Sequence, residues 1–253
     1  IIYLPIQRIN PILSQVAFPL FSKIKDETLR LKRNYLKYIN LILSVSAPIL
    51  AGITATSPVI IPLFLSEKWI PAVPIVQALS FYVFIRLIFN ASGSLMMAKG
   101  KANWTFYWNM IMLLVIPSVT YIALIASGSV IGVCLALGAM FSVFFFFHYA
   151  LFLRNLLGPF FREYILTIAR PFILSSSMGI GVFLLSLTLQ GFPETLSLFI
   201  LISFGSVYYS IMTIYFNPAF VDELEKLLPG KLSKFLTVIR SMLTLSYTSS
   251  YSS

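Results

Sequence analysis

The chain has 253 residues, of which 58% are hydrophobic and only 10% are charged, and its mean hydropathy is +0.91. Soluble domains carry about one quarter charged residues, so this composition excludes an ordinary cytosolic enzyme, a secreted domain and a disordered chain. The net charge of +10 could suggest nucleic-acid binding, but the basic residues are spread between apolar runs, as in loops beside a membrane. We therefore predict a polytopic membrane protein that binds lipid and no nucleic acid.

Seven apolar runs are long enough, in whole or in part, to cross a membrane. A helix needs about 20 apolar residues to span a hydrocarbon core of about 30 Å. The runs lack the alternating ten-residue pattern of a transmembrane β-barrel, so the predicted fold class is all-α, a helix bundle over 1–216. The predicted spans are about 1–21, 36–57, 72–98, 104–126, 129–152, 165–189 and 195–216.

The basic residues alternate strictly between the loops, which predicts the orientation of the bundle. Fifteen of the eighteen lysines and arginines fall on one side, Lys68 falls on the other, and Arg8 and Arg86 lie within spans. The rule that positive loops face the cytoplasm then places the 22–35 loop, the 99–104 loop and the C-terminal tail inside. The fifteen are Lys23, Lys25, Arg30, Lys32, Arg33, Lys37, Lys99, Lys101, Arg154, Arg162, Arg170, Lys226, Lys231, Lys234 and Arg240.

Three further segments are predicted to be neither spans nor plain loops. Residues 57–65 are too short to cross and contain two prolines, so we expect an interfacial or re-entrant element on the outer side. Asn217-Pro218 is a typical helix start, and residues 217–243 are predicted to form amphipathic helices on the cytoplasmic membrane surface. The Ser/Tyr-rich residues 244–253 are expected to be disordered.

Prolines recur within the predicted spans. Each removes one backbone hydrogen bond and tends to kink its helix. They can reflect simple tolerance of proline in lipid, or a bundle that bends between states as transporters do. The prolines concerned are Pro5, Pro11, Pro19, Pro48, Pro117 and Pro171.

Side chains suited to catalysis or metal binding are scarce. The single cysteine, Cys134, lies in an apolar run, so no disulfide framework or cysteine-based metal cage forms within the chain. The single histidine, His148, is expected near a helix end and not as a ligand. All eight carboxylates fall between or after the apolar runs, and no P-loop, HExxH or GxSxG motif occurs. We therefore expect no catalytic residue, no metal, no cofactor and no enzyme activity.

Arg86 is the most informative residue in the sequence. It lies about 20 Å along a helix from Lys99 and about 22 Å from Pro71, which places it near the membrane midplane. A charge at that depth normally faces a cavity or a partner. At 100° per residue, one polar stripe on this helix face comprises Tyr82, Arg86, Asn90, Gly93, Ser94 and Met97, whereas Gln77 falls on the opposite face.

Two interpretations of Arg86 remain open at this point. In the first, Tyr82, Arg86, Asn90 and Ser94 form a cationic site for an anionic substrate group such as a pyrophosphate or an acidic sugar. In the second, Arg86 pairs with a carboxylate from an upstream half of the protein, or with backbone carbonyls at a kink. Arg8, with Gln15 on roughly the same face, is a second candidate substrate-binding residue.

Several short motifs over about residues 3–110 together resemble those of bacterial polysaccharide-transport flippases. These are the O-antigen and colanic acid exporters of the multidrug/oligosaccharidyl-lipid/polysaccharide exporter superfamily. Ser66 stands where this family usually has glycine. The motifs are Val16-Ala17-Phe18-Pro19-Leu20-Phe21-Ser22-Lys23, Leu29-Arg30-Leu31-Lys32-Arg33-Asn34-Tyr35, Ala47-Pro48-Ile49-Leu50-Ala51-Gly52, Glu67-Lys68-Trp69, Ala72-Val73-Pro74, Arg86, Gly93 and Ala98-Lys99-Gly100-Lys101.

The resemblance implies two helical lobes around a central cavity, of which this chain is the C-terminal one. It implies transport of a polyprenyl-pyrophosphate-linked oligosaccharide for lipopolysaccharide, capsule or exopolysaccharide synthesis, by alternating access, in the bacterial inner membrane. Such transporters are about twice as long and the chain opens inside an apolar run, so we expect a missing N-terminal lobe as a partner. The alternatives are a multidrug and toxin exporter of the same fold, or a membrane glycan ligase or glycosyltransferase. A multidrug and toxin exporter would need carboxylates within the membrane, and a glycan ligase or glycosyltransferase would need a large outer loop.

Overall fold

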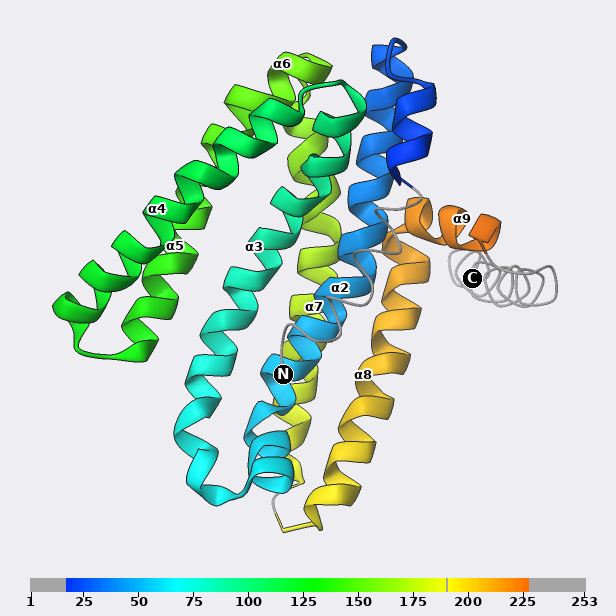
Figure 1. The fold of residues 1–253 in the computed structure, drawn as a ribbon. Helices are drawn as coiled ribbons and strands as arrows, with labels where there is room; N and C mark the ends of the chain where they lie inside the picture. Colours follow the sequence, from blue (N-terminus) through cyan, green and yellow to red (C-terminus); the bar gives the residue numbers. More distant parts are fainter. Residues whose placement is uncertain (1–16, 190, 228–253) are drawn as a thin grey trace, which may run out of the picture.

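A computed structural model describes residues 17–189 and 191–227, and most of these residues are helical (Figure 1). Residues 17–23 are helical and precede α2. No strand occurs in the described ranges, as the all-α prediction requires. The elements are α2 (Thr28–Leu65), η1 (Glu67–Ala72), α3 (Val73–Ala98), α4 (Ala102–Ser127), α5 (Val130–His148), the π-helix η2 (Tyr149–Leu153), α6 (Arg154–Leu157), α7 (Phe161–Thr188), α8 (Glu194–Phe216) and α9 (Pro218–Leu227).

Six stretches in the described part of the chain are long and apolar enough to cross a membrane. They contain α2, α3, α4, α5, α7 and α8, and they correspond to six of the seven predicted spans. The remaining predicted span, about 1–21, lies mostly outside the described residues. Large apolar side chains such as Leu114, Phe199 and Ile180 are exposed on these helices, as expected of surfaces that contact lipid.

Helix α2 is the central element of the bundle. It packs against α3, α7 and α8 along its length, and α3 in turn packs against α5. Figure 1 shows α2, α3, α7 and α8 running side by side, the α4–α5 hairpin leaning away from them beside α3, and α9 leaving the end of α8 sideways. The turn at 99–101 and the α6–α7 connection lie at one end of α3 and α7, and the 66–72 and 189–193 connections lie at the other.

Two sequence-based predictions about α2 are wrong. Residues 57–65 are not an interfacial or re-entrant element but the last turns of α2, and most of the predicted 22–35 loop is its first turns. A helix of 38 residues is about 57 Å long, so α2 extends well beyond a hydrocarbon core of about 30 Å. Basic residues on its first turns therefore project past the membrane as helix and not as loop.

At Pro48 and Pro58, other side chains bond the carbonyl groups that these prolines leave without an N–H partner. Pro48 leaves the Ser44 carbonyl, which accepts a hydrogen bond of 2.8 Å from the Tyr209 hydroxyl of α8. Pro58 leaves the Thr54 carbonyl, which accepts bonds from Gln77 Nε2 of α3 at 3.3 Å and from the Ser57 hydroxyl at 2.9 Å. The prediction that the span ends near Pro58 did not take these donors into account.

The predicted fifth span ends in irregular helix. Helix α5 ends at His148, and the chain then passes through the π-helical turn η2 into α6. The His148 ring is buried at a helix end, as predicted, and lies 4.8 Å from the Phe89 ring and 5.5 Å from the Trp108 ring, centroid to centroid. Its surroundings are therefore aromatic.

A buried polar network joins the start of α2 to the corner between α8 and α9. The side-chain amides of Asn40 and Asn217 exchange two hydrogen bonds of 3.1 and 3.0 Å. Asn217 Nδ2 also donates to the Ser44 hydroxyl at 2.9 Å. All three side chains are buried, so each bond replaces one that water would make in the unfolded chain. This network, which we call the asparagine clasp, fixes the end of α8 on α2.

We predict that Asn217→Ala lowers the free energy of unfolding by about 1–3 kcal/mol, because it leaves the buried Asn40 amide without its partner. The measurement is thermal unfolding of the purified protein in detergent. Asn155→Ala is the matched control, since Asn155 is exposed and bonds only to the Leu151 carbonyl one turn away. Equal losses in the two variants would contradict a special contribution of the clasp.

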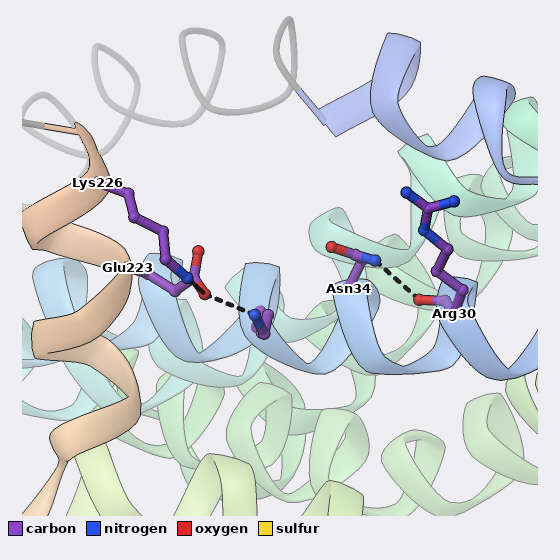
Figure 2. Close-up of polar contacts among 5 residues, drawn as sticks. Arg30, Asn34, Glu223 and Lys226 are labelled. Atoms are coloured by element: carbon purple, nitrogen blue, oxygen red, sulfur yellow. Dashed lines mark hydrogen bonds and ion pairs between the residues drawn. The ribbon is translucent and has the colours of Figure 1, made fainter.

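Helix α9 begins at Pro218, as predicted, and is held against α2 by charge as well as by apolar contact. Glu223 Oε1 accepts hydrogen bonds from Lys37 Nζ of α2 at 2.7 Å and from Lys226 Nζ at 3.0 Å. Figure 2 shows Glu223 and Lys226 on α9 beside the first turns of α2, where Asn34 Nδ2 donates to the Arg30 carbonyl. The rest of the predicted amphipathic region, 228–243, and the tail 244–253 lie outside the described residues.

The same contacts set the ionisation of Glu223. Partial burial raises the pKa of its carboxyl group, but the hydrogen bonds and charges of Lys37 and Lys226 outweigh burial, and the pKa lies below its ordinary value of 4.5. A lowered pKa means that folding favours the ionised form. The stabilising contribution of the ionised Glu223 carboxylate is complete above about pH 4.5 and is lost as the pH falls through the lowered pKa.

We predict that α9 detaches from α2 more readily in acid than at neutral pH. Both partners are partly exposed, so the effect is at most about 1 kcal/mol. Spin labels at the exposed positions Leu29 and Ala219 should give a broader distance distribution at pH 3.5 than at pH 7. Glu223→Gln should be broad at both values, whereas Glu67→Gln, at the other end of α2, should keep the response. A Glu223→Gln protein that still responds to pH would assign the effect to another group.

Candidate substrate-binding site

Arg86 lies in the middle of α3, as the sequence predicts. It is 13 residues from Val73 and 12 from Ala98, which is about 18–20 Å from either end of the helix. Its Nη1 donates a hydrogen bond of 2.9 Å to the Tyr82 hydroxyl, and its guanidinium carbon lies 5.9 Å from the centre of the Tyr82 ring. The Tyr82 ring packs edge-on against Phe141 of α5 at 5.1 Å. Tyr82, which is held by its ring contact with α5, therefore positions the guanidinium group of Arg86.

The other members of the predicted stripe are in different environments. Asn90 and Met97 are exposed, and a side chain added at Gly93 would meet nothing within 4 Å. Ser94 is buried. The structure thus brings Tyr82 and Arg86 together and leaves Asn90 on an open surface of α3. Arg8 lies outside the described residues, so its place relative to this stripe stays a prediction.

No carboxylate of this chain lies at the depth of Arg86. Glu67 is in η1, Glu163 and Glu194 are in the first turns of α7 and α8, and the others precede α2 or lie on α9. The middle of the described bundle therefore carries a cationic group but no acidic one. A positive charge next to a phenol hydroxyl and an exposed amide is suited to binding phosphate or sugar oxygens.

The opposite face of α3 lines an apolar cavity of about 350 Å³ between α2, α3 and α7. Gln77 lies on that face, as the helical wheel predicts, and its amide bonds to Thr54 as described above. This cavity was not predicted from the sequence, although small residues recur at four-residue spacing on both neighbouring helices. These are Ala47, Ala51 and Ala55 on α2, and Ser175 and Gly179 on α7.

Close approach of α2 and α7 explains the small residues. A side chain at Gly179 would lie 3.4 Å from the Ala51 side chain and 3.5 Å from the Ala51 carbonyl oxygen. A second cavity, of about 470 Å³, lies between α2, α7 and α8 and is lined by Gly52, Gly205 and Tyr209 among others. Helix α2 is thus a wall shared by two cavities.

The fold and these features define a polytopic, all-α membrane protein with a single arginine in the middle of α3. In comparison with known proteins, residues 1–74 match the model of the polysaccharide biosynthesis protein family. The predicted resemblance to membrane proteins of polysaccharide biosynthesis is thereby confirmed. No solved structure matches the chain significantly.

The similar curated proteins carry names from the same field. The teichuronic acid biosynthesis protein TuaB of Bacillus subtilis is 31% identical over 92% of this chain and 48% of its own length. The lipopolysaccharide biosynthesis protein WzxC of Escherichia coli is 31% identical over 74% of this chain and 38% of its own. An uncharacterized membrane protein in the cps region of Klebsiella pneumoniae is 30% identical over 85% of this chain and 44% of its own length. The chain spans about half the length of the curated relatives it matches.

Proposed function

We propose that this chain is one helical lobe of a flippase that moves a polyprenyl-pyrophosphate-linked oligosaccharide across the bacterial inner membrane by alternating access. The observation that carries the proposal is Arg86, a cation in the middle of a spanning helix beside an open surface of α3. The names of the relatives, which refer to lipopolysaccharide and teichuronic acid biosynthesis, favour a glycan substrate. Because those relatives are about twice as long, a second lobe would complete the pathway.

In this proposal the guanidinium group of Arg86 binds pyrophosphate oxygens, for which its planar set of donors is suited. Tyr82 accepts one Arg86 donor and so orients the group. Asn90, which is exposed one turn further along the helix, offers an amide to phosphate or sugar hydroxyls. Ser94 is buried and would support the surface from below, and Arg8 would add a second cation. The role of the chain is transport without covalent chemistry.

The two alternatives fit the described bundle less well. A multidrug and toxin exporter would use carboxylates in the membrane to bind cations and protons, and all eight carboxylates lie at helix ends or outside the spans. A glycan ligase or glycosyltransferase would need catalytic residues in a large outer loop. The connections on the predicted outer side, at 66–72, 128–129 and 189–193, are short. These observations favour a transporter of an anionic substrate.

We also propose that the C-terminus and the 22–35 and 99–104 regions face the cytoplasm, because basic residues are concentrated at that end of the bundle. Single cysteines at Ser127 and Gly191 should react with a membrane-impermeant maleimide in intact cells. A cysteine at Lys101 should react only after the membrane is opened. The native Cys134 is buried and should contribute little background. Labelling of the Lys101 position in intact cells would reverse the proposed orientation.

The function is tested by complementing a bacterial strain that lacks its polysaccharide flippase, with the second lobe supplied on a co-expressed chain. Arg86→Ala should lower surface polysaccharide at least about tenfold, because it removes a charged hydrogen-bonding group. Arg86→Lys keeps the charge but loses the planar donors, so it should retain partial transport. Arg33→Ala, an exposed arginine on the first turns of α2, is the control and should be neutral.

Membrane insertion of each variant is checked by immunoblot of the membrane fraction. Full surface polysaccharide with a normally inserted Arg86→Ala protein would contradict the role of Arg86. Rescue by this chain alone would contradict the need for a second lobe.

A further inference from the structure

A pocket of about 500 Å³ lies where α6 ends and α7 begins, far along the chain from the Arg86 site. Its shape is built by a tight connection between the two helices. Gly158 ends α6 with a backbone φ of +81°, which glycine adopts without strain, and its N–H bonds to the Arg154 carbonyl. The Phe160 N–H then donates a hydrogen bond of 2.7 Å to the Tyr149 hydroxyl of the π-helical turn η2. This bond holds the floor of the pocket in place.

Basic side chains outnumber acidic ones in the lining of the pocket. Arg154 and Arg162 both line it, and both side chains are exposed. Its one carboxylate, Glu163, is already engaged by Lys32 Nζ at 3.2 Å. The four ion pairs within the described ranges include neither arginine. Two guanidinium groups therefore share one pocket whose single carboxylate is paired with Lys32, which favours binding of an anion from outside the chain.

The surface beside the pocket is apolar and faces outward from the bundle. Phe161, which lines the pocket, is 39% exposed and packs against Phe146, which is 59% exposed. Phe147 and Leu151 on the same segment are also exposed. An exposed aromatic and aliphatic surface directly next to arginines is typical of a protein at the boundary between lipid tails and headgroups.

We propose that this pocket binds the phosphodiester headgroup of an anionic membrane phospholipid, such as phosphatidylglycerol. Arg154 and Arg162 hold the phosphate oxygens, and the glycerol backbone and first acyl carbons lie on Phe161 and its exposed neighbours. Of the candidate anions, a lipid is the one that satisfies both halves of the site, because a free phosphate would leave the apolar surface unused. The proposal goes beyond the transport function and does not depend on it.

The test is native mass spectrometry of the delipidated, detergent-purified protein with an equimolar mixture of phosphatidylglycerol and phosphatidylcholine. The wild-type protein should bind phosphatidylglycerol preferentially. Each arginine removed should weaken that binding about fivefold, so Arg154→Ala/Arg162→Ala should bind the two lipids nearly equally. Arg154→Lys/Arg162→Lys should be intermediate, since the charge is kept and the planar donors are lost.

Arg30→Ala/Arg33→Ala is the matched control, because it removes two arginines from the same end of the bundle but outside the pocket. It should keep the wild-type preference, and all three double variants should unfold at the wild-type temperature. Equal preference in the wild-type protein, or an unchanged preference in Arg154→Ala/Arg162→Ala, would overturn the proposal. Displacement of phosphatidylglycerol by millimolar inorganic phosphate would also overturn it and would indicate a site for the free anion.

Discussion

A hydrocarbon environment offers no water to an unpaired backbone group, and most of this structure follows from that constraint. The constraint requires helices, but it also decides which helices are tied together. Each proline inside α2 leaves one carbonyl without its N–H partner. At Pro48 and Pro58 that carbonyl is bonded by a side chain from a different helix, Tyr209 in one case and Gln77 in the other. The prolines of α2 therefore create the attachment points for α8 and α3.

The same central helix determines where space remains in the bundle. Small residues on the α2 face toward α7 let the two backbones approach closely, and Gly179 leaves no room for a side chain without contact to Ala51. Space that small residues leave beside this contact forms the two cavities on either side of α2. The Arg86 surface lies away from both cavities, on the far face of α3. The width of α3 thus separates the proposed polar site from the cavity between α2, α3 and α7, and the second cavity lies beyond α2.

Hydropathy and charge were sufficient to predict most of this architecture. Apolar runs located the six described spans, because length and apolarity are properties of a single segment. The span boundaries and helical geometry were also sufficient to place Arg86 in the middle of α3 and Gln77 on the opposite face of that helix. Residues 57–65 were wrongly assigned because local rules treat two prolines as the end of a helix. The carbonyl that Pro58 leaves accepts bonds from Ser57 of the same helix and from Gln77 of α3, and a rule that treats proline as a helix end considers neither donor.

Several of the features that sequence reasoning missed join distant parts of the chain. Asn40 and Asn217 are 177 positions apart, and Ser44 and Tyr209 are 165 positions apart. Nothing in either local sequence marks these residues as partners. The pocket at Arg154 and Arg162 was not predicted for a different reason, because both arginines were interpreted only as evidence for the orientation of the bundle in the membrane. Only the turn at Gly158 brings them to one pocket.

The hydrogen bonds also show what would be lost if a helix beside α2 separated from it. Moving α8 away would leave the Ser44 carbonyl without the Tyr209 hydroxyl and would break the asparagine clasp, and each buried group left unpaired costs about 1–3 kcal/mol. Moving α3 away would break the buried hydrogen bond of 2.7 Å between the Tyr35 and Ser92 hydroxyls and would remove Gln77 from the Thr54 carbonyl, although that carbonyl keeps its shorter bond to Ser57. Buried hydrogen bonds therefore tie both α3 and α8 to α2. Since α3 carries Arg86, these bonds fix the position of the proposed substrate-binding surface relative to α2 and α8.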